Sequence, residues 1–198
     1  MTSSPLILAI GDSLVAGYGL ATADGFAAQL ERRLRGRYSE ASVRPAARSG
    51  DTSADALRRL PTILSSLRAR PDLAIVQVGP NDMLRRIAPA TTRANLDAIL
   101  VELGRCGVPV LLTTVAPPPF LQGQARDYLG IHTEVAARHG AETWPFVPPG
   151  VLGHPQMVLG DRVHPNAAAI ARVTDAMLPV VERMLGDAHG SAPPRADA

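Results

Sequence analysis

The stretch ILAIGDSLVAGYGL, residues 7 to 20, places an apolar run directly before a Gly-Asp-Ser turn. The run LILAI, residues 6 to 10, predicts a buried strand. Gly, Asp and Ser are favoured where a chain leaves a strand, so turn chemistry alone can explain the segment. A functional interpretation of Ser13 therefore needs support from elsewhere in the chain.

The rest of the chain alternates between apolar runs and runs with helical periodicity. Further strands are predicted at 42–48, 72–78, 108–115 and 143–147. Pro45 marks the first of these as an edge strand, because proline removes a ladder donor. Helices are predicted at 24–38, 53–60, from Pro61 onward, 91–105, 125–138 and 166–185. Asp24 is expected to cap the first of them, and Pro179 to kink the last or end its first segment. This order predicts an α/β fold in which helices cover both faces of a parallel sheet.

Length and composition favour one globular domain. The chain has 198 residues, of which 46% are hydrophobic and 19% charged, which is ordinary for a compact domain. We expect a single domain at 1–186 and a flexible tail at 187–198, where the sequence DAHGSAPPRADA has the composition of a frayed terminus. The single cysteine, Cys106, precedes a helix-ending glycine and is predicted to be a buried structural thiol.

The charge pattern argues against a nucleic-acid partner. All 20 basic residues are arginine, they are scattered, and the net charge is only +2. A surface that tracks phosphates would gather them on one face, so the pairs Arg32-Arg33, Arg58-Arg59 and Arg85-Arg86 are interpreted as solvated helix faces. No apolar run is long enough to span a membrane. The short segment before the first strand does not resemble a signal peptide, so the chain as given is expected in the cytoplasm; no oligomeric state is predicted.

Polar loops follow three of the predicted strands. Ser13 follows the first, SGDTS (49–53) the second and GPND (79–82) the third. Ligands of open α/β sheets gather at the carboxyl ends of the strands. We therefore expect these loops to meet at one edge of the sheet.

Late in the chain, GDRVHPN (160–166) supplies a base and a carboxylate. A serine hydroxyl is a weak nucleophile unless a base takes its proton and a third group orients that base. His164 and Asp161 lie three residues apart, which allows the carboxylate to fold back onto the imidazole. Backbone N–H groups of Ser13 and Gly50 and the amide of Asn81 are candidate donors for an oxyanion.

These motifs resemble, in order, the four blocks of the GDSL, or SGNH, hydrolase family. The blocks are Gly11-Asp12-Ser13-Leu14, Gly50, Gly79-Pro80-Asn81-Asp82 and Asp161-Arg162-Val163-His164. The likeness covers about residues 6–186 and is strongest to the bacterial branch of thioesterase I, protease I, lysophospholipase L1 and the arylesterases. A single motif is weak evidence, whereas four in the correct order are specific.

The resemblance implies a three-layer, flavodoxin-like α/β/α fold around a mostly five-stranded parallel sheet. It further implies hydrolysis of small-molecule acyl esters or thioesters through an acyl-enzyme, with no metal or other cofactor. In this assignment Ser13 is the nucleophile, His164 the base and Asp161 its orienting acid, while Ser13, Gly50 and Asn81 form the oxyanion hole. Pro80 departs from the glycine that this branch often has, and we expect it to alter the shape of the pocket rather than abolish activity.

Other polar residues receive structural interpretations. Asp12 is expected to shape the nucleophile turn, Asp51 and Asp82 to brace loops, and His132, His139 and His154 to lie at helix ends or in turns. Asp161 and His164 could supply only two metal ligands, so no metal site is predicted. The apolar residues expected to flank the substrate are Leu14, Met83, Leu84, Phe120 and Val163.

Two alternatives stay open at this stage. The same fold and residues would serve a carbohydrate or other small-group O-deacetylase. The motifs could also be turn chemistry in a non-catalytic, flavodoxin-like binding domain. Preference for acetylated sugars would favour the first alternative, and failure of a fluorophosphonate probe to label Ser13 would favour the second.

Overall fold

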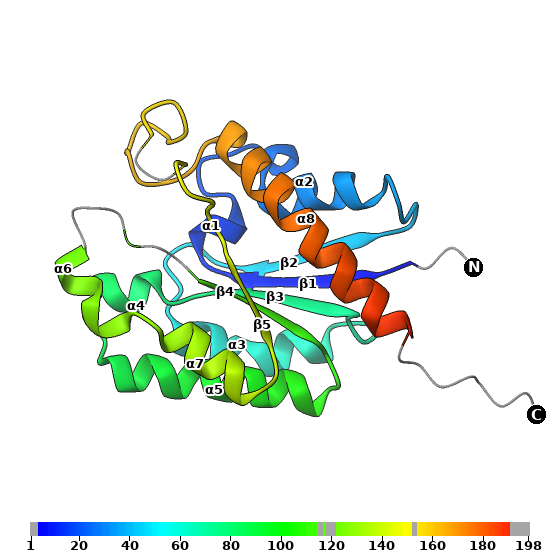
Figure 1. Ribbon diagram of the computed structural model, residues 1–198, viewed down its shortest axis with the longest axis horizontal. Helices are drawn as coiled ribbons and strands as arrows, with labels where there is room; N and C mark the ends of the chain where they lie inside the picture. Colours follow the sequence, from blue (N-terminus) through cyan, green and yellow to red (C-terminus); the bar gives the residue numbers. More distant parts are fainter. Residues whose placement is uncertain (1–3, 115–116, 118–121, 152–153, 191–198) are drawn as a thin grey trace, which may run out of the picture.

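Five parallel strands form one sheet, in the order β2-β1-β3-β4-β5 (Figure 1). The computed structural model describes residues 4–114, 117, 122–151 and 154–190. The strands are β1 (Leu6–Gly11), β2 (Ser42–Ala47), β3 (Leu73–Gln77), β4 (Val110–Thr114) and β5 (Glu142–Pro145). All four pairings are parallel, and β2, the strand with Pro45, lies at the edge as predicted.

Helices cover both faces of the sheet because successive strand residues point to opposite sides. Ile7 and Ala9 of β1 belong to a core shared with α2 (Phe26–Leu34) and α8 (Ala167–Gly190). Leu8 and Ile10 belong to a second core shared with α3 (Ser53–Ser65), α5 (Pro89–Arg105) and α7 (Ile131–Arg138). The two helical layers lie above and below the sheet in Figure 1. The predicted three-layer α/β fold is confirmed.

Short elements stand at the carboxyl ends of the strands. They are the helices α1 (Ser13–Ala16), α4 (Pro80–Leu84) and α6 (Gln122–Ala125) and the 3-10 turns η1 (Thr22–Asp24) and η3 (Arg126–Tyr128). The strand order changes direction between β1 and β3, which is where ligands bind in such sheets. The loops carrying Ser13 and Asn81 flank this point.

Two helices run through prolines; a new helix is predicted to start at the first, Pro61, and a kink is predicted at the second, Pro179. α3 continues through Pro61 and α8 through Pro179. Both prolines lie on the exposed side of their helices, so the carbonyl that loses its hydrogen bond can be reached by water. Buried residues on either side, such as Leu60 and Met177, keep each helix on the sheet.

Three local predictions are wrong. The helix expected at 125–138 is divided, because Gly130 adopts a φ of 82° before α7. Asp24 belongs to η1 and does not cap α2, whose first turn follows Gly25. Cys106 is exposed rather than buried, since it lies after the last turn of α5.

Two further predictions concern the C-terminal boundary of the domain and the absence of a membrane-spanning segment. α8 extends to Gly190, past the boundary expected at 186, and residues 191–198 lie outside the described part. Within the described residues, no helix has the length and apolar character needed to cross a bilayer.

Candidate active site

The first strand delivers Ser13 to the edge of the sheet. β1 ends at Gly11, and Asp12 then caps α1 because its Oδ1 accepts a hydrogen bond from the Leu14 N–H at 3.0 Å. Ser13 is the first residue of α1. The Gly-Asp-Ser turn is therefore a helix cap that presents the serine directly beyond the strand, and Asp12 shapes this turn as predicted.

Ser13, His164 and Asp161 form a continuous chain of hydrogen bonds. His164 Nε2 lies 3.0 Å from Ser13 Oγ, and His164 Nδ1 lies 2.7 Å from Asp161 Oδ2. The other carboxylate oxygen, Oδ1, accepts the N–H groups of Val163 at 2.9 Å and His164 at 3.0 Å. Residues 151 positions apart in the sequence are thus in contact.

The charge of Asp161 determines how the protons are arranged. Its pKa is lowered to about 2, first by the backbone N–H of His164, then by that of Val163 and by the imidazole. An ionised carboxylate only accepts hydrogen bonds, so Nδ1 of a neutral His164 carries the proton. Nε2 is then the acceptor for the Ser13 hydroxyl, as a general base requires.

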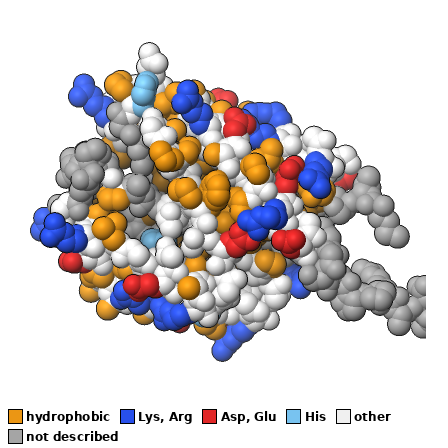
Figure 2. Space-filling view, viewed as in Figure 1, with side chains coloured by type: hydrophobic (Ala, Val, Ile, Leu, Met, Phe, Trp, Pro, Cys, Tyr) orange, Lys and Arg blue, Asp and Glu red, His pale blue; other side chains and the backbone are white. Residues whose placement is uncertain are grey.

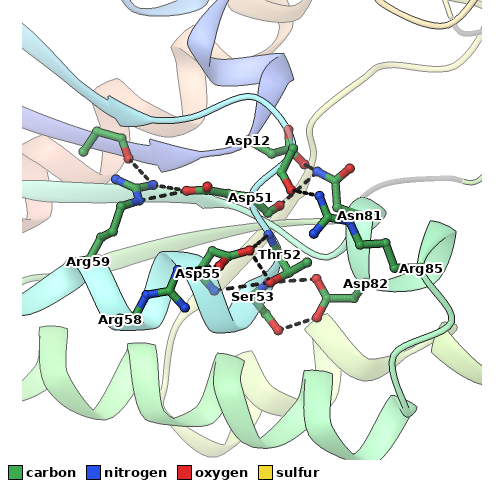
Figure 3. A network of polar contacts seen from close by, with 12 residues as sticks. Asp12, Asp51, Thr52, Ser53, Asp55, Arg58, Arg59, Asn81, Asp82 and Arg85 are labelled. Carbon is green, nitrogen blue, oxygen red and sulfur yellow. Dashed lines mark hydrogen bonds and ion pairs between the residues drawn. The ribbon is translucent and has the colours of Figure 1, made fainter.

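Gly50 lies in the loop after β2 and Asn81 in the first turn of α4, and these two segments are bonded to one another. Asn81 Nδ2 donates to the carbonyl of Asp51 at 2.9 Å, while its distance to Asp12 Oδ2 is 3.4 Å, too long for a strong bond. Arg85 Nη2 donates to the carbonyl of Gly50 at 2.7 Å. Figure 3 shows this network from Asp12 to Arg85. The second amide proton of Asn81 is therefore only weakly engaged.

The Asn81 loop is supported from behind by His132. Its Nε2 lies 2.8 Å from the carbonyl of Val78, which can only accept, so Nε2 carries a proton. Burial lowers the pKa of His132. Gly79 has a φ of 122°, and a Cβ there would lie 2.9 Å from His132 Nε2. His132 lies in the first turn of α7, at a helix end as expected, but it is half-buried against the site loop rather than on the surface.

Pro80 fits this loop without loss of a hydrogen bond. It occupies the first turn of α4, where a backbone N–H has no partner within the helix. Asn81 follows immediately and still donates to Asp51.

The carboxylates of Asp51 and Asp82 brace the loops, as expected. Asp82, fully buried, accepts from the backbone N–H of Ser53 at 2.8 Å, from its hydroxyl, and from Thr92 Oγ1 at 3.1 Å. Asp51 pairs with Arg59, whose Nε lies 2.8 Å away. Arg59 and Arg85 therefore belong to this network, although their arginine pairs are predicted as solvated helix faces.

The residues expected to flank the substrate divide into several groups. Met83 is buried beneath its loop and Leu14 packs against the core. Leu84 and Val163 are about half exposed, at 50% and 48%. Phe120 lies outside the described residues.

The remaining ligand-type residues are dispersed. His139 is bonded to Asp97 at 2.9 Å, and His154 is exposed and accepts from the Gln156 N–H. Over the described ranges, no group of three or more His, Cys, Asp or Glu residues is arranged to hold a metal ion.

Comparison with known proteins identifies the family. The model of the GDSL-like lipase/acylhydrolase family matches residues 9–172. The chain belongs to this family. Its relatives include esterase TesA of Pseudomonas aeruginosa, 34% identical over 90% of this chain and 89% of the relative, and thioesterase 1/protease 1/lysophospholipase L1 of Escherichia coli K12, 31% identical over 86% and 80%. A crystal structure of AlinE4, an SGNH-hydrolase family esterase, superposes with a TM-score of 0.75 at 39% identity, covering 92% and 97%.

Membership of the GDSL-like family makes the protein a carboxylic-ester hydrolase. Three residues that the sequence analysis does not place at the site also contact it: the Tyr18 ring packs on His164, Arg85 donates to the Gly50 carbonyl, and His132 donates to the Val78 carbonyl. Tyr18 could have been noticed, since it lies between two glycines directly after the nucleophile motif. Arg85 and His132 have no comparable signal in the sequence.

Asp12 is expected to make the stability of this GDSL-like protein depend on pH. Only 1% of its surface is exposed, and burial raises its pKa from the ordinary 3.8 to about 6. The folded state therefore binds the proton more tightly than the unfolded chain, so this group lowers the free energy of unfolding as pH rises from about 4 to about 6. The difference corresponds to about 3 kcal/mol.

An Asp12→Asn variant tests this expectation. Asparagine cannot ionise, and its oxygen can still cap α1. Its NH₂ group would take the place of Oδ2, which faces Gln77 Nε2, so the Gln77 amide must turn over to present Oε1, a buried atom for which no partner is described, as the acceptor. Its stability relative to wild type should increase by about 3 kcal/mol between pH 4 and pH 8, or about 6 to 12 °C in Tm. Thermal unfolding across this pH range measures the effect, and a difference that does not vary with pH would contradict it.

Proposed function

We propose that Ser13 is the nucleophile, His164 the general base and Asp161 its orienting acid in hydrolysis of acyl esters and thioesters. The observation that carries this proposal is the hydrogen-bond chain from Ser13 Oγ through the imidazole to Asp161 Oδ2. A serine becomes reactive when a base with this orientation accepts its proton. The position of Ser13 at the switch point of the sheet supports the same role.

In this mechanism, Ser13 Oγ attacks the carbonyl carbon of the substrate while its proton moves to His164 Nε2. Asp161 stabilises the resulting imidazolium through the proton on Nδ1. The imidazolium then gives its proton to the departing alcohol or thiol, which leaves an acyl-enzyme on Ser13. Water, activated by the same imidazole, attacks the acyl group, and release of the carboxylic acid restores the serine.

The negative oxygen of each tetrahedral intermediate is bound by the N–H groups of Ser13 and Gly50 and by Asn81 Nδ2. Preorganised donors of this kind contribute about 10² to 10³ in rate each. The bonds from Asn81 to Asp51 and from Arg85 to Gly50 support the proposal, because they limit movement of both loops before substrate arrives.

An apolar acyl group is the preferred substrate element. In the described residues, four of the five exposed large hydrophobic side chains stand in segments at the carboxyl ends of the strands; they are Tyr18, Leu84, Leu129 and Val163. Such a rim favours contact with hydrocarbon over the hydroxyl-rich surface of a sugar. We therefore rank acyl-ester and thioester hydrolysis above sugar deacetylation.

We expect no nucleic-acid partner. On the face seen in Figure 2, acidic and basic side chains are interspersed rather than separated by sign. A phosphate-binding surface would instead collect arginines along one path.

A labelling experiment combined with a substrate series tests the function. A fluorophosphonate probe should modify Ser13 in folded protein and leave the Ser13→Ala variant unlabelled. The value of kcat/KM for p-nitrophenyl esters should rise a few-fold per methylene from acetate to butyrate, and a butyryl thioester should also be cleaved. Labelling elsewhere would contradict the assignment of Ser13, and a strong preference for acetylated sugars would favour the deacetylase.

A further inference from the structure

A tyrosine of the apolar rim, Tyr18, packs on the imidazole of His164. The ring centroids of Tyr18 and His164 are 4.4 Å apart and the planes are inclined by 35°. Tyr18 nevertheless leaves 51% of its surface exposed, whereas His164 is half-buried. The tyrosine ring therefore covers one face of the imidazole at the rim of the site.

The backbone ties Tyr18 to the nucleophile. Gly17 N–H and Tyr18 N–H both donate to the carbonyl of Ser13, each at 3.1 Å. These bonds close the last turn of α1. The position of the tyrosine is consequently set by Ser13 itself.

The next residue contacts the loop that carries His164. Gly19 has a φ of 72°, and a Cβ there would lie only 2.7 Å from Leu159 Cδ1. The Leu159 N–H in turn donates to the carbonyl of His164 at 2.8 Å. The turn from Gly17 to Gly19 thus meets the loop that carries His164 at two points. One is the ring of Tyr18, and the other is Gly19, where any larger residue would displace the side chain of Leu159.

We propose that Tyr18 is a positioning residue for His164, which keeps Nε2 directed at Ser13 Oγ and favours the imidazolium formed during proton transfer. This inference rests on the proposed function of the triad. Hydrogen bonds to Asp161 and Ser13 hold the two nitrogens of the ring, and Tyr18 supports its face. A cation gains electrostatic stabilisation from the face of an aromatic ring, which the neutral imidazole gains only weakly.

An experiment on Tyr18 must separate its effect on the titration of His164 from the effects of nearby charged groups. Two carboxyl groups act on His164: the carboxylate of Asp161, bonded to Nδ1, and the buried carboxyl of Asp12. Neither is altered by replacing Tyr18. A change in the titration of His164 would therefore report the loss of the aromatic face.

Replacement of Tyr18 by leucine tests the role in two independent measurements. Leucine retains apolar bulk but no aromatic face, so kcat/KM should fall about 3- to 10-fold. The midpoint of the His164 titration, followed by NMR with the signal assigned from its loss in His164→Ala, should move about 0.4 to 0.7 pH units lower. Tyr18→Phe, which keeps the aromatic face, should keep the wild-type His164 midpoint, and Tyr18→Trp, with its stronger aromatic face, should move the midpoint higher.

Tyr38→Leu provides a matched control. Tyr38 packs against the core at the opposite end of β2 and carries Arg37 over its ring at 5.6 Å. This variant should lower Tm and leave the His164 midpoint unchanged. An unchanged midpoint in Tyr18→Leu, or a change confined to KM, would overturn the positioning role, whereas hydrolysis that survives Ser13→Ala would overturn the proposed function instead.

Discussion

Replacing Ser13 or His164 by alanine is expected to lower kcat for p-nitrophenyl butyrate by about 10⁶-fold. Ser13 Oγ and His164 Nε2 share one hydrogen bond of 3.0 Å, and neither group can perform its step without the other. The Ser13→Ala/His164→Ala double variant should therefore lose no more than either single variant. Residual hydrolysis above the uncatalysed rate would come from binding and the oxyanion donors alone.

His154→Ala and Ser65→Ala are the matched controls for this prediction. His154 is exposed in a loop that precedes the histidine motif, and Ser65 donates to the carbonyl of Thr62 on the surface of α3. Both should retain wild-type kcat. Equal rates in wild type, Ser13→Ala and His164→Ala would refute the assignment of the triad.

The centre of the sheet could be predicted from the sequence because its strands are apolar and buried on both faces. LILAI and DLAIVQV carry the pattern of strands buried on both faces, and β1 and β3 are the central strands on which the register of the others depends. Pro45 identified the edge for a purely local reason, the missing N–H. Such signals are contained within a few residues, so no knowledge of tertiary contacts is needed to read them.

The features that could not be predicted depend instead on contacts between distant parts of the chain. Pro61 carries a local signal for a helix start, which tertiary packing of the buried face of α3 overrides. The contacts of His132 with Val78 and of Arg85 with Gly50 join residues 54 and 35 positions apart, and only the folded chain brings them together. Ser13, Asp161 and His164 could be singled out because their motifs resemble a known family, whereas their supporting residues lie outside these motifs.

Asp161→Asn is expected to lower kcat by about 10⁴-fold while leaving the fold intact. The reason lies in the two oxygens of the carboxylate. Oδ1 accepts the N–H groups of Val163 and His164, so an asparagine at this position is forced to keep its oxygen there. Its NH₂ group must then replace Oδ2 and face His164 Nδ1.

An amide donor at that point favours the tautomer of His164 that carries its proton on Nε2. Nδ1 would accept from the asparagine, the proton of the neutral imidazole would move to Nε2, and Nε2 could no longer accept the proton of Ser13. Kinetics of p-nitrophenyl butyrate hydrolysis measure the loss, and NMR of the imidazole nitrogens should show the proton on Nε2 instead of Nδ1. Asp97→Asn is the control, because Asp97 also bonds a histidine, His139, at 2.9 Å but lies on α5 away from Ser13. Wild-type kcat in Asp161→Asn would mean that the carboxylate holds the loop and takes no part in orienting the base.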